Sequence, residues 1–299
     1  MSHLLVLGNA GTDLVCSVPY FPRAGETLMA AAVRRAPGGK GLNQAVAAAR
    51  AGAAVRFLAP LGQDAEGDRV AAALTKEWMA ELQLPRPGPG TDFSVVMVAT
   101  NAENAILSSG AAADALTPEQ AASFAGSGVA GDLLLMQGNL SHSATLAAMR
   151  AARQRGLRTM LNPAPLRWDV SALLRHCDIV VANAREAEDI TGVSGIAGAI
   201  RLREMGPGLS IVTLGAAGCV VAEADGTWAA SAPAVVATDT SGAGDAFCGT
   251  LAALLLAGLN LGVVVEAAQR IAAYSVQRAG AFASLPDAAV MRTLISRAD

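Results

Sequence analysis

Residues 239–247 read Asp-Thr-Ser-Gly-Ala-Gly-Asp-Ala-Phe, between an apolar run of strand length and a long apolar helical pattern. Gly242 and Gly244 let the backbone approach an anion closely. The free N–H groups at a helix start, together with the helix dipole, favour a phosphate at the same place. A carboxylate, Asp245, follows directly. It either caps the helix or takes a proton from a hydroxyl that attacks the phosphate.

Strand-like and helical patterns alternate outward from this stretch. Strands are predicted at 4–7, 55–59, 133–137, 158–161, 178–181, 210–214 and 235–237, and helices at 43–50, 65–78, 143–155 and 246–257. Repeated strand–helix units predict a parallel sheet that is covered by helices on both faces. In such sheets the ligand lies beyond the carboxyl ends of the strands, so the turns after the strands are the expected site of chemistry.

Two segments interrupt this alternation. Extended patterns at 13–18 and 27–33 flank one turn, and a second hairpin pattern covers 93–99 and 104–109. No helices separate these short strands from their partners. They therefore predict a small antiparallel sheet apart from the main one.

The composition and the order of the patterns predict one folded domain. Hydrophobic residues make up 53% of the 299 residues and charged residues 16%, which is the opposite of the balance that disorder needs. Strand–helix units lie on both sides of the second hairpin. We therefore expect a single domain over 1–299, with inserted segments at about 13–36 and 92–110.

Charge and residue spacing argue against several classes of protein. A formal net charge of -3 gives no basic surface for nucleic acid. Four scattered cysteines and three histidines lack the spacing of zinc ligands and indicate a reducing compartment. No signal-peptide pattern is found, and Asn260 within the apolar stretch 249–265 favours buried helices over a membrane span. We expect a cytoplasmic protein that binds neither nucleic acid nor membrane.

Two other phosphate-binding patterns are missing from the sequence. A P-loop needs G-x-x-x-x-G-K-[ST], but Lys40 is followed by Gly41, and Arg34 stands at the first glycine position. A Rossmann G-x-G-x-x-G pattern fails at Phe247. A nucleotide-dependent oxidoreductase is therefore the weaker interpretation.

Two separated motifs resemble the signatures of the ribokinase-like (PfkB) carbohydrate kinase family. Residues 38–45, Gly-Gly-Lys-Gly-Leu-Asn-Gln-Ala, resemble the first signature, and 239–245 resemble the second, D-T-x-[GA]-A-G-D. Between them lie Asn-Pro-Ala-Pro at 162–165 and an N-x-x-E motif at 183–186, and the resemblance covers essentially the whole chain. It implies a ribokinase-like three-layer αβα sandwich with a mainly parallel sheet and a small antiparallel β lid. It also implies ATP-dependent phosphorylation of a sugar hydroxyl.

The resemblance also implies roles for individual residues. Asp245 matches the general base, and the amides of Gly242, Ala243 and Gly244 match the anion hole. The sugar-contacting positions are Asp13, Gly39, Lys40, Asn43, Asn139 and Asp245. The positions for ATP and Mg²⁺ are Asn183, Glu186, Thr213 and Gly215. The positions for K⁺ or a similar monovalent cation are Asp239, Ser241, Ser275, Arg278, Gly280 and Ser284.

Ordinary structural explanations stay open for several of these residues. Asn43 is expected in the first turn of a helix, and Asn183 with Glu186 has the spacing of a capping box. Asp239 has the place of a residue that ends a strand in a turn.

Two positions depart from the pattern of the family's ribose kinases. This chain has Gly11 where they carry Asn two residues before Asp13, and Asn139 where they carry Glu. Both departures remove partners for sugar hydroxyls, and Gly11 is expected to open space for a larger substituent. A nucleoside or another sugar such as a ketose is therefore an alternative to ribose, which stays possible if water fills the gap. A non-catalytic sugar-binding protein on the same fold is a further alternative, against which Asp245 argues.

The predicted second hairpin also indicates self-association. The strand at 93–99 has fairly apolar faces on both sides, because Val95, Met97 and Ala99 alternate with Ser94, Val96 and Val98. One face is available to cover substrate and the other to meet a partner. We expect a homodimer built on the lid.

Overall fold

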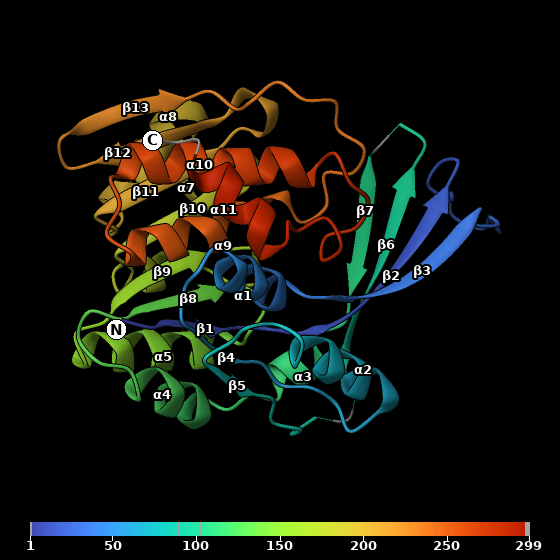
Figure 1. The fold of residues 1–299 in the computed structure, drawn as a ribbon, viewed down its shortest axis with the longest axis horizontal. Helices are drawn as coiled ribbons and strands as arrows, with labels where there is room; N and C mark the ends of the chain where they lie inside the picture. The colour runs from blue at the N-terminus through green and yellow to red at the C-terminus, as the bar shows by residue number, and fades with distance from the viewer. Residues whose placement is uncertain (1, 89, 102, 297–299) are drawn as a thin grey trace.

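The computed structural model describes residues 2–88, 90–101 and 103–296. The two ends of the domain predicted over 1–299, and residue 102 within the segment predicted at about 92–110, lie outside these ranges. The described chain forms a nine-stranded sheet and a separate four-stranded sheet (Figure 1).

The nine-stranded sheet has the order β13-β12-β11-β10-β9-β8-β1-β4-β5. Its strands are β1 Leu4–Leu7, β4 Val55–Leu58, β5 Glu81–Gln83, β8 Leu133–Gln137, β9 Arg158–Asn162, β10 Ile179–Asn183, β11 Leu209–Thr213, β12 Cys219–Glu223 and β13 Gly226–Ala230. The seven strands from β11 to β5 in this sheet order pair in parallel, which confirms the predicted parallel sheet. The antiparallel edge formed by β12 and β13 was not predicted.

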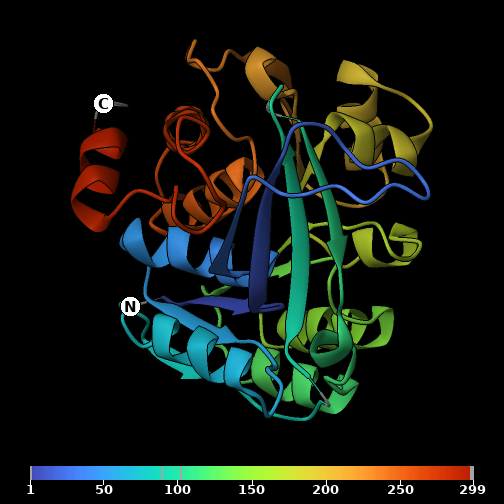
Figure 2. The ribbon, with the colours of Figure 1, turned by 90° about the vertical axis from the view of Figure 1, so that its right-hand side faces the viewer.

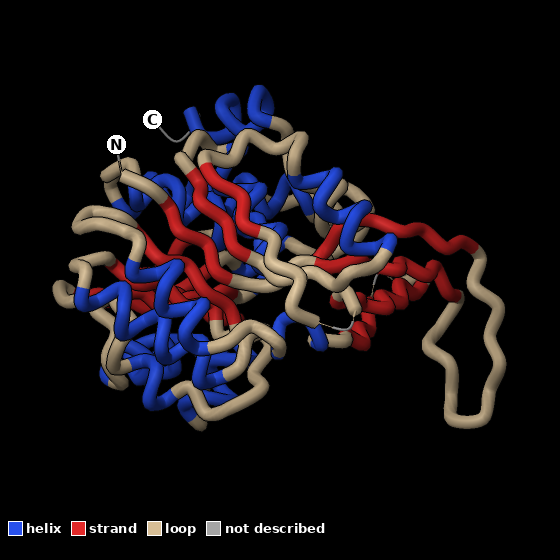
Figure 3. Tube along the Cα trace, turned by 90° about the horizontal axis from the view of Figure 1, so that it is seen from below, coloured by secondary structure: helices blue, strands red, loops and turns tan. Residues whose placement is uncertain are grey.

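Helices cover both faces of this sheet, so the three-layer arrangement is confirmed (Figures 1 and 3). One face packs against α1 Lys40–Arg50, α2 Ala65–Leu74, α9 Ala243–Leu256, α10 Leu261–Ser275 and α11 Ala288–Ser296. The other packs against α3 Ala111–Asp114, α4 Pro118–Gly126, α5 His142–Gln154, α6 Ser171–Leu174, α7 Ala184–Thr191 and α8 Gly195–Glu204. Because side chains alternate along a strand, Leu4 and Val6 enter the first core and Leu5 and Leu7 the second. Among the described helices, none is long and apolar enough to cross a bilayer.

The four-stranded sheet stands at the side of the main body, in front of the viewer in Figure 2. Its order is β3-β2-β6-β7, with β2 Gly11–Val18, β3 Ala32–Gly38, β6 Asp92–Ala99 and β7 Asn104–Ser108. The hairpins β2–β3 and β6–β7 are antiparallel, whereas β2 and β6 pair in parallel. In each hairpin the chain runs away from the main body on the first strand, β2 or β6. These two strands are neighbours in the middle of the sheet, so they run in the same direction.

Three predicted elements differ from the structure. The strand predicted at 27–33 lies further along the sequence, as β3, because the residues that pair with β2 are Ala32–Gly38. The apolar run at 235–237 is not a strand, and Val236 is 88% exposed because no neighbouring strand pairs with it among the described residues. The helix predicted over 65–78 ends at Leu74, and Trp78 is 87% exposed.

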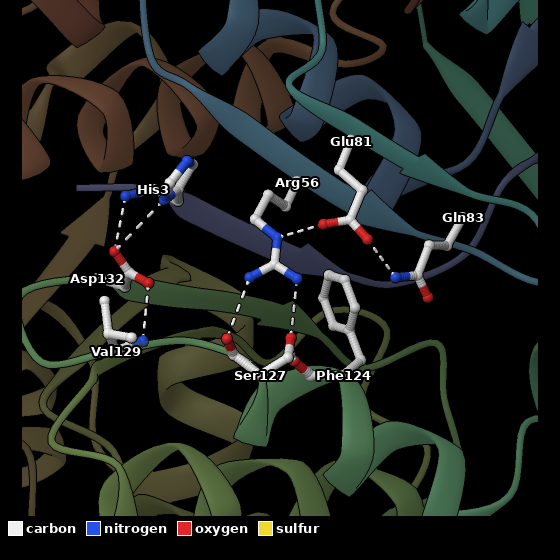
Figure 4. A network of polar contacts seen from close by, with 8 residues as sticks. All are labelled: His3, Arg56, Glu81, Gln83, Phe124, Ser127, Val129 and Asp132. Atoms are coloured by element: carbon white, nitrogen blue, oxygen red, sulfur yellow. Dashed lines mark hydrogen bonds and ion pairs between the residues drawn. The ribbon is translucent and has the colours of Figure 1, made fainter. Parts of the chain in front are cut away.

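Polar side chains hold the short edge strand β5 against the body (Figure 4). The guanidinium of Arg56 on β4 donates to Glu81 Oε2 at 2.5 Å and to Ser127 Oγ at 2.8 Å. It also lies over the ring of Phe124, 5.7 Å from its centroid. Glu81 in turn accepts from Gln83. The edge strand is thereby tied to α4 as well as to its neighbour in the sheet.

Helices α1 and α9 approach each other closely because α9 carries a glycine at their contact. A Cβ atom at Gly249 would lie 2.3 Å from the carbonyl oxygen of Gln44 and 2.8 Å from Ala47 Cβ. This approach brings Asp245, one turn earlier on α9, within hydrogen-bonding distance of Asn43 and Gln44.

Replacing Gly249 by alanine is expected to force α1 and α9 apart. Overpacking a core typically costs ~1–3 kcal/mol, so Gly249→Ala should lower the free energy of unfolding by that amount in urea denaturation. Gly126→Ala is the matched control, because a Cβ at this last residue of α4 would meet nothing closer than Ala151 Cβ at 3.9 Å. The control should be neutral or stabilising by up to ~1 kcal/mol. Equal losses in the two variants would contradict the close helix contact.

Candidate active site

The predicted site residues gather beyond the carboxyl ends of the parallel strands. From β1 the chain extends the sheet to β4 and β5 on one side, and later to β8 and its neighbours on the other. Ligands of open α/β sheets bind at such a reversal of strand order. Figure 2 looks onto this edge, with the four-stranded sheet in front of it.

The start of α9 has the geometry of an anion cradle. Gly242 is the N-cap residue with a φ of 78°, a left-handed conformation that favours glycine, and a Cβ there would lie 2.7 Å from Ala281. A Cβ at Gly244 would meet nothing within 4 Å, so space is open beside the first turn. The first amides of a helix have no intrahelical partners and attract anions.

Asp245 is buried beside this cradle, with an exposure of 4%. Asn43 Nδ2 donates to its Oδ2 at 3.2 Å and Gln44 Nε2 donates to its Oδ1 at 3.0 Å. The ammonium of Lys40 lies 3.8 Å from Oδ1, and the negative charge of Asp245 is the main cause that raises the pKa of Lys40. Residues from the two predicted motifs therefore meet around one carboxylate.

Asp13 on β2 faces the same carboxylate. A Cβ at Gly38 would lie 2.2 Å from the Asp13 carboxyl group, so the glycine of the neighbouring strand makes room for this side chain. Burial, and then the charge of Asp245, raise the pKa of Asp13 from 3.8 to about 7. A hydrogen bond from Ser94 and the charge of Lys40 act in the opposite direction.

Asn9, which the sequence analysis did not single out, anchors the motif at 38–45. Its Oδ1 accepts from Gly41 N at 3.2 Å, and its carbonyl oxygen accepts from Leu42 N at 3.0 Å. A Cβ at Gly41 would lie 2.6 Å from the Asn9 nitrogen, and Gly39 begins α1 with a φ of 101°. The signal available in the sequence was a polar residue two positions after a buried strand, at the edge where ligands bind.

Three buried side-chain amides beside Asp245 were not predicted as site residues. Gln44, Gln137 and Asn162 have exposures of 0%, 1% and 7% and bond to one another. Gln137 ends the otherwise apolar strand β8, and Asn162 follows the apolar pair Met160 and Leu161 at the end of β9, which was the signal that could have found them.

The residues predicted for ATP and Mg²⁺ lie side by side at the ends of β10 and β11. Asn183 pairs with Thr213 in the sheet register, and Gly215 follows with a φ of 60°. Glu186 N donates to Asn183 Oδ1 at 2.8 Å, and Asn183 N donates to Glu186 Oε2 at 2.9 Å, so the capping box is present. The negative charge of Glu186 contributes to the raised pKa of Lys40, after the larger effect of Asp245. The Glu186 carboxylate therefore faces the same ammonium group as Asp245 does.

The two segments predicted for a monovalent cation meet at Asp239. This buried carboxylate accepts from Ser241 N at 2.9 Å and from Gly280 N at 2.7 Å. Thr238 N donates to the carbonyl oxygen of Val276 at 2.7 Å, which joins the same two segments.

Three other residues predicted to bind the monovalent cation have side chains that contact other groups. The buried hydroxyls of Ser275 and Ser284 donate to the carbonyls of Ala272 and Ala281 at 2.8 and 3.1 Å. The guanidinium of Arg278 lies over Tyr274, 3.4 Å from the ring centroid. Arg278 therefore has its backbone carbonyl, and not its side chain, to offer to a cation.

The expectation that Gly11 opens the pocket is wrong. A Cβ at Gly11 would lie 2.1 Å from the carbonyl oxygen of Asp92, because β6 runs beside β2 with these two residues in register. The space that the missing side chain leaves is filled by the backbone of the neighbouring strand.

Asn139 lies directly after the end of β8, beside this edge. Its Oδ1 is buried and has no hydrogen-bond partner among the described residues. Its carbonyl oxygen accepts from Arg167 at 2.5 Å, and Arg167 also pairs with Asp114 at 2.8 Å. The backbone is thereby held while the amide oxygen stays available to a donor.

The raised pKa of Asp13 predicts a pH-dependent stability. Between pH 3.8 and about 7 the folded protein retains a proton on this carboxyl that the unfolded chain has lost. The contribution of Asp13 to the free energy of unfolding therefore falls as the pH rises through this window. Asp13→Asn should match the wild type at pH 3.5 and be more stable than it at pH 8, in urea denaturation of the ligand-free protein.

Asp287→Asn is the control of opposite sign. The N–H groups of Val290 and Ala289 lower the pKa of Asp287, so this variant should lose stability relative to the wild type as the pH rises. If Asp13→Asn follows the wild type at every pH, its carboxyl does not carry the raised pKa.

Comparisons with known proteins agree with this fold. The family model described as pfkB family carbohydrate kinase matches residues 1–288. A ribokinase of Haemophilus influenzae is 35% identical over 294 residues, which are 95% of this chain and 95% of that protein. A deoxyribokinase of Salmonella typhi is 32% identical over 292 residues, again 95% of each chain.

Solved structures show the same likeness. The ribokinase of Thermotoga maritima superposes with a TM-score of 0.87 at 26% identity, over 99% of this chain and 100% of that one. The Arabidopsis thaliana ribokinase complexed with ribose and ATP superposes with a TM-score of 0.83 at 25% identity, over 99% of each chain.

Proposed function

The chain belongs to the pfkB family of carbohydrate kinases, and we propose that Asp245 is the base with which it phosphorylates a sugar hydroxyl from ATP. One observation carries the proposal: the Asp245 carboxylate is buried beside the open first turn of α9. A hydroxyl between the two can lose its proton to Asp245 while it attacks a phosphate held by the amides of Gly242, Ala243 and Gly244.

The proposed reaction needs positioning and charge neutralisation more than covalent chemistry. The oxygen–phosphorus bond to the sugar forms as the bond to ADP breaks, and the hydroxyl proton passes to Asp245. Lys40 supplies positive charge next to this carboxylate. Asn43 keeps a buried amide oxygen without a partner among the described residues, which suits a second sugar hydroxyl as donor.

The capping box engages Asn183 Oδ1 and Glu186 Oε2, so the second carboxylate oxygen of Glu186 is the one that would hold a magnesium ion, which prefers oxygen ligands. Bound there through water, Mg²⁺ would neutralise charge on the phosphates of ATP. Thr213 and Gly215, in the neighbouring strand and turn, would border the nucleotide.

The four-stranded sheet is proposed to serve as a lid on the sugar. Asp13 reaches the site from β2, and Asn104 on β7 donates to Ser241 Oγ at 3.1 Å, next to the anion cradle. A cover of this kind would exclude water, which otherwise competes as acceptor.

The same sheet supports the proposal of a homodimer. On the face of the sheet opposite to Asp13, three apolar side chains are exposed, with Val33 at 56%, Phe93 at 49% and Leu107 at 69%. A second copy that covers these side chains would remove apolar area from water.

Replacing Asp245 by asparagine should remove the base and keep the fold. We expect kcat to fall by ~10²–10⁴-fold while ATP binding, measured by calorimetry, stays close to that of the wild type. Asp132→Asn is the control, because Asp132 is equally buried but accepts from His3 N and Val129 N at the other end of the sheet. A variant Asp245→Asn that keeps more than about a third of the wild-type rate would remove Asp245 from this role.

Asn139 is proposed to reduce the preference for ribose. A neutral amide in place of the Glu of ribose kinases offers a weaker partner for a hydroxyl, so a sugar that lacks this hydroxyl, such as deoxyribose, would compete well. We expect Asn139→Glu to raise the ratio of kcat/KM for ribose over deoxyribose by about tenfold.

The panel should also contain fructose and a nucleoside. A wild-type enzyme that ranks ribose first by a wide margin, with the ratio unchanged in Asn139→Glu, would contradict this assignment. A leading kcat/KM for fructose or the nucleoside would favour the alternative substrates.

Activation by K⁺ is proposed because Asp239 joins the two segments beside the anion cradle. A bound cation would fix the loop that aims the amides, which is preorganisation and not direct chemistry. We expect kcat to be higher in K⁺ than in Na⁺ buffer, and Asp239→Asn to abolish the difference. Equal rates of the wild type in Na⁺, K⁺ and Cs⁺ would refute the proposal.

A further inference from the structure

Buried side-chain amides form a connected set of hydrogen bonds that ends on Asp245. Asn162 Nδ2 donates to the carbonyl oxygen of Val181 at 2.9 Å. Gln44 Nε2 donates to Asn162 Oδ1 at 3.1 Å and to Asp245 Oδ1 at 3.0 Å. Gln137 Nε2 donates to Gln44 Oε1 at 3.0 Å. Each donor in the set has an acceptor, and the carboxylate receives one of these bonds.

The backbone of β10 decides which way these amides point. A peptide carbonyl such as that of Val181 only accepts, so Asn162 must turn its NH₂ group toward it and its oxygen toward Gln44. Gln44 must then present its own NH₂ group to Asn162 and to Asp245, and its oxygen to Gln137. The carboxylate of Asp245 therefore meets an N–H group and not a second oxygen.

The set is built on strands and not on loops. Gln137 and Asn162 are paired neighbours at the ends of β8 and β9. A Cβ at Gly8 would lie 2.1 Å from Gln137 Oε1, so this side chain packs on the backbone that follows β1. Groups held by rigid elements keep an orientation better than groups on loops.

We propose that Gln44 is a positioning residue for phosphoryl transfer: held by Gln137 and Asn162, its amide fixes the Asp245 carboxylate and keeps it ionised. The inference rests on the proposed role of Asp245 as the base. A hydrogen bond to the charged form of a carboxyl favours that form, and a fixed carboxylate keeps the geometry that proton transfer needs.

Four other groups act on the charge at this place. Lys40 on α1 places its ammonium 3.8 Å from Asp245 Oδ1, and the carboxyl group of Asp13 on β2 faces Asp245 from the other sheet. Cys248, one turn further along α9, is neutral because burial raises the pKa of its thiol. Glu186 on α7 acts on Lys40. Gln44 differs from all four because it carries no charge and acts through its N–H group alone.

The test is the pH dependence of kcat at saturating sugar and ATP. Using kcat, and not kcat/KM, avoids the titration of Asp13 in the free enzyme. In Gln44→Met the acid limb should move to higher pH by about one unit, because the lost N–H bond disfavours the ionised carboxylate. The plateau should fall by about tenfold or more, because the carboxylate is less well oriented. Gln137→Met should move the acid limb in the same direction by less.

Gln269→Met is the matched control for loss of a buried glutamine. Gln269 is 5% exposed and donates to Cys219 Sγ at 3.1 Å and to the carbonyl of Ala230 at 3.0 Å, on α10. This variant should lower Tm and leave the acid limb in place. A purely structural Gln44 would behave in the same way.

The two proposals fail in different ways. If Asp245→Asn is inactive and the acid limb of Gln44→Met coincides with that of the wild type, the positioning role is wrong and the base is kept. If Asp245→Asn is active, both are wrong. Should Gln44→Met not fold, Gln44→Glu keeps the volume and sets a carboxyl against Asp245, which must also move the acid limb to higher pH. An unmoved limb in that variant would overturn the inference.

Discussion

The buried carboxylate of Asp245 is the interaction on which the rest of this structure depends. A charge taken out of water is costly unless hydrogen bonds and an opposite charge replace its hydration. Here the donors are Asn43 and Gln44, which lie 202 and 201 positions away in the chain, and the opposite charge is Lys40. The first and last thirds of the chain must therefore fold against each other before the carboxylate is satisfied. Gly249 permits this by letting α9 lie against the backbone of α1.

The same site carries features that work against stability. The raised pKa of Asp13 reflects a carboxyl that is buried and held near a second carboxylate. Asn43 and Asn139 keep buried oxygens without partners in the described part of the chain. Unpaired buried acceptors of this kind cost free energy in the ligand-free protein. In the proposed function, hydroxyl groups of the sugar supply the missing donors. Function and stability oppose each other at this edge of the sheet.

The placement of the site follows from the main sheet, and the cover that we propose over it is the small one. The parallel strands present polar end residues at one edge, and the helix starts of α1 and α9 lie over that edge. The parallel pairing of β2 with β6 joins two hairpins from distant parts of the chain into one sheet beside it. Such a sheet can move as one unit, which suits a cover over a reaction that water must not enter.

Local patterns in the sequence were sufficient for the fold class, and the resemblance of two motifs to the family signatures identified Lys40, Asn43 and Asp245, which meet at the site. The motifs at 38–45 and 239–245 depend on glycine conformations and helix starts, which are properties of neighbouring residues, and the structure brings them together around Asp245. Three features came only from the tertiary structure. Among the described residues the run at 235–237 has no strand to pair with, the space beside Gly11 is filled by the backbone of β6, and Gln44 on α1 meets amides at the ends of β8 and β9. Each depends on a partner from a distant part of the chain, and apolarity, residue size and spacing along the sequence do not determine that partner.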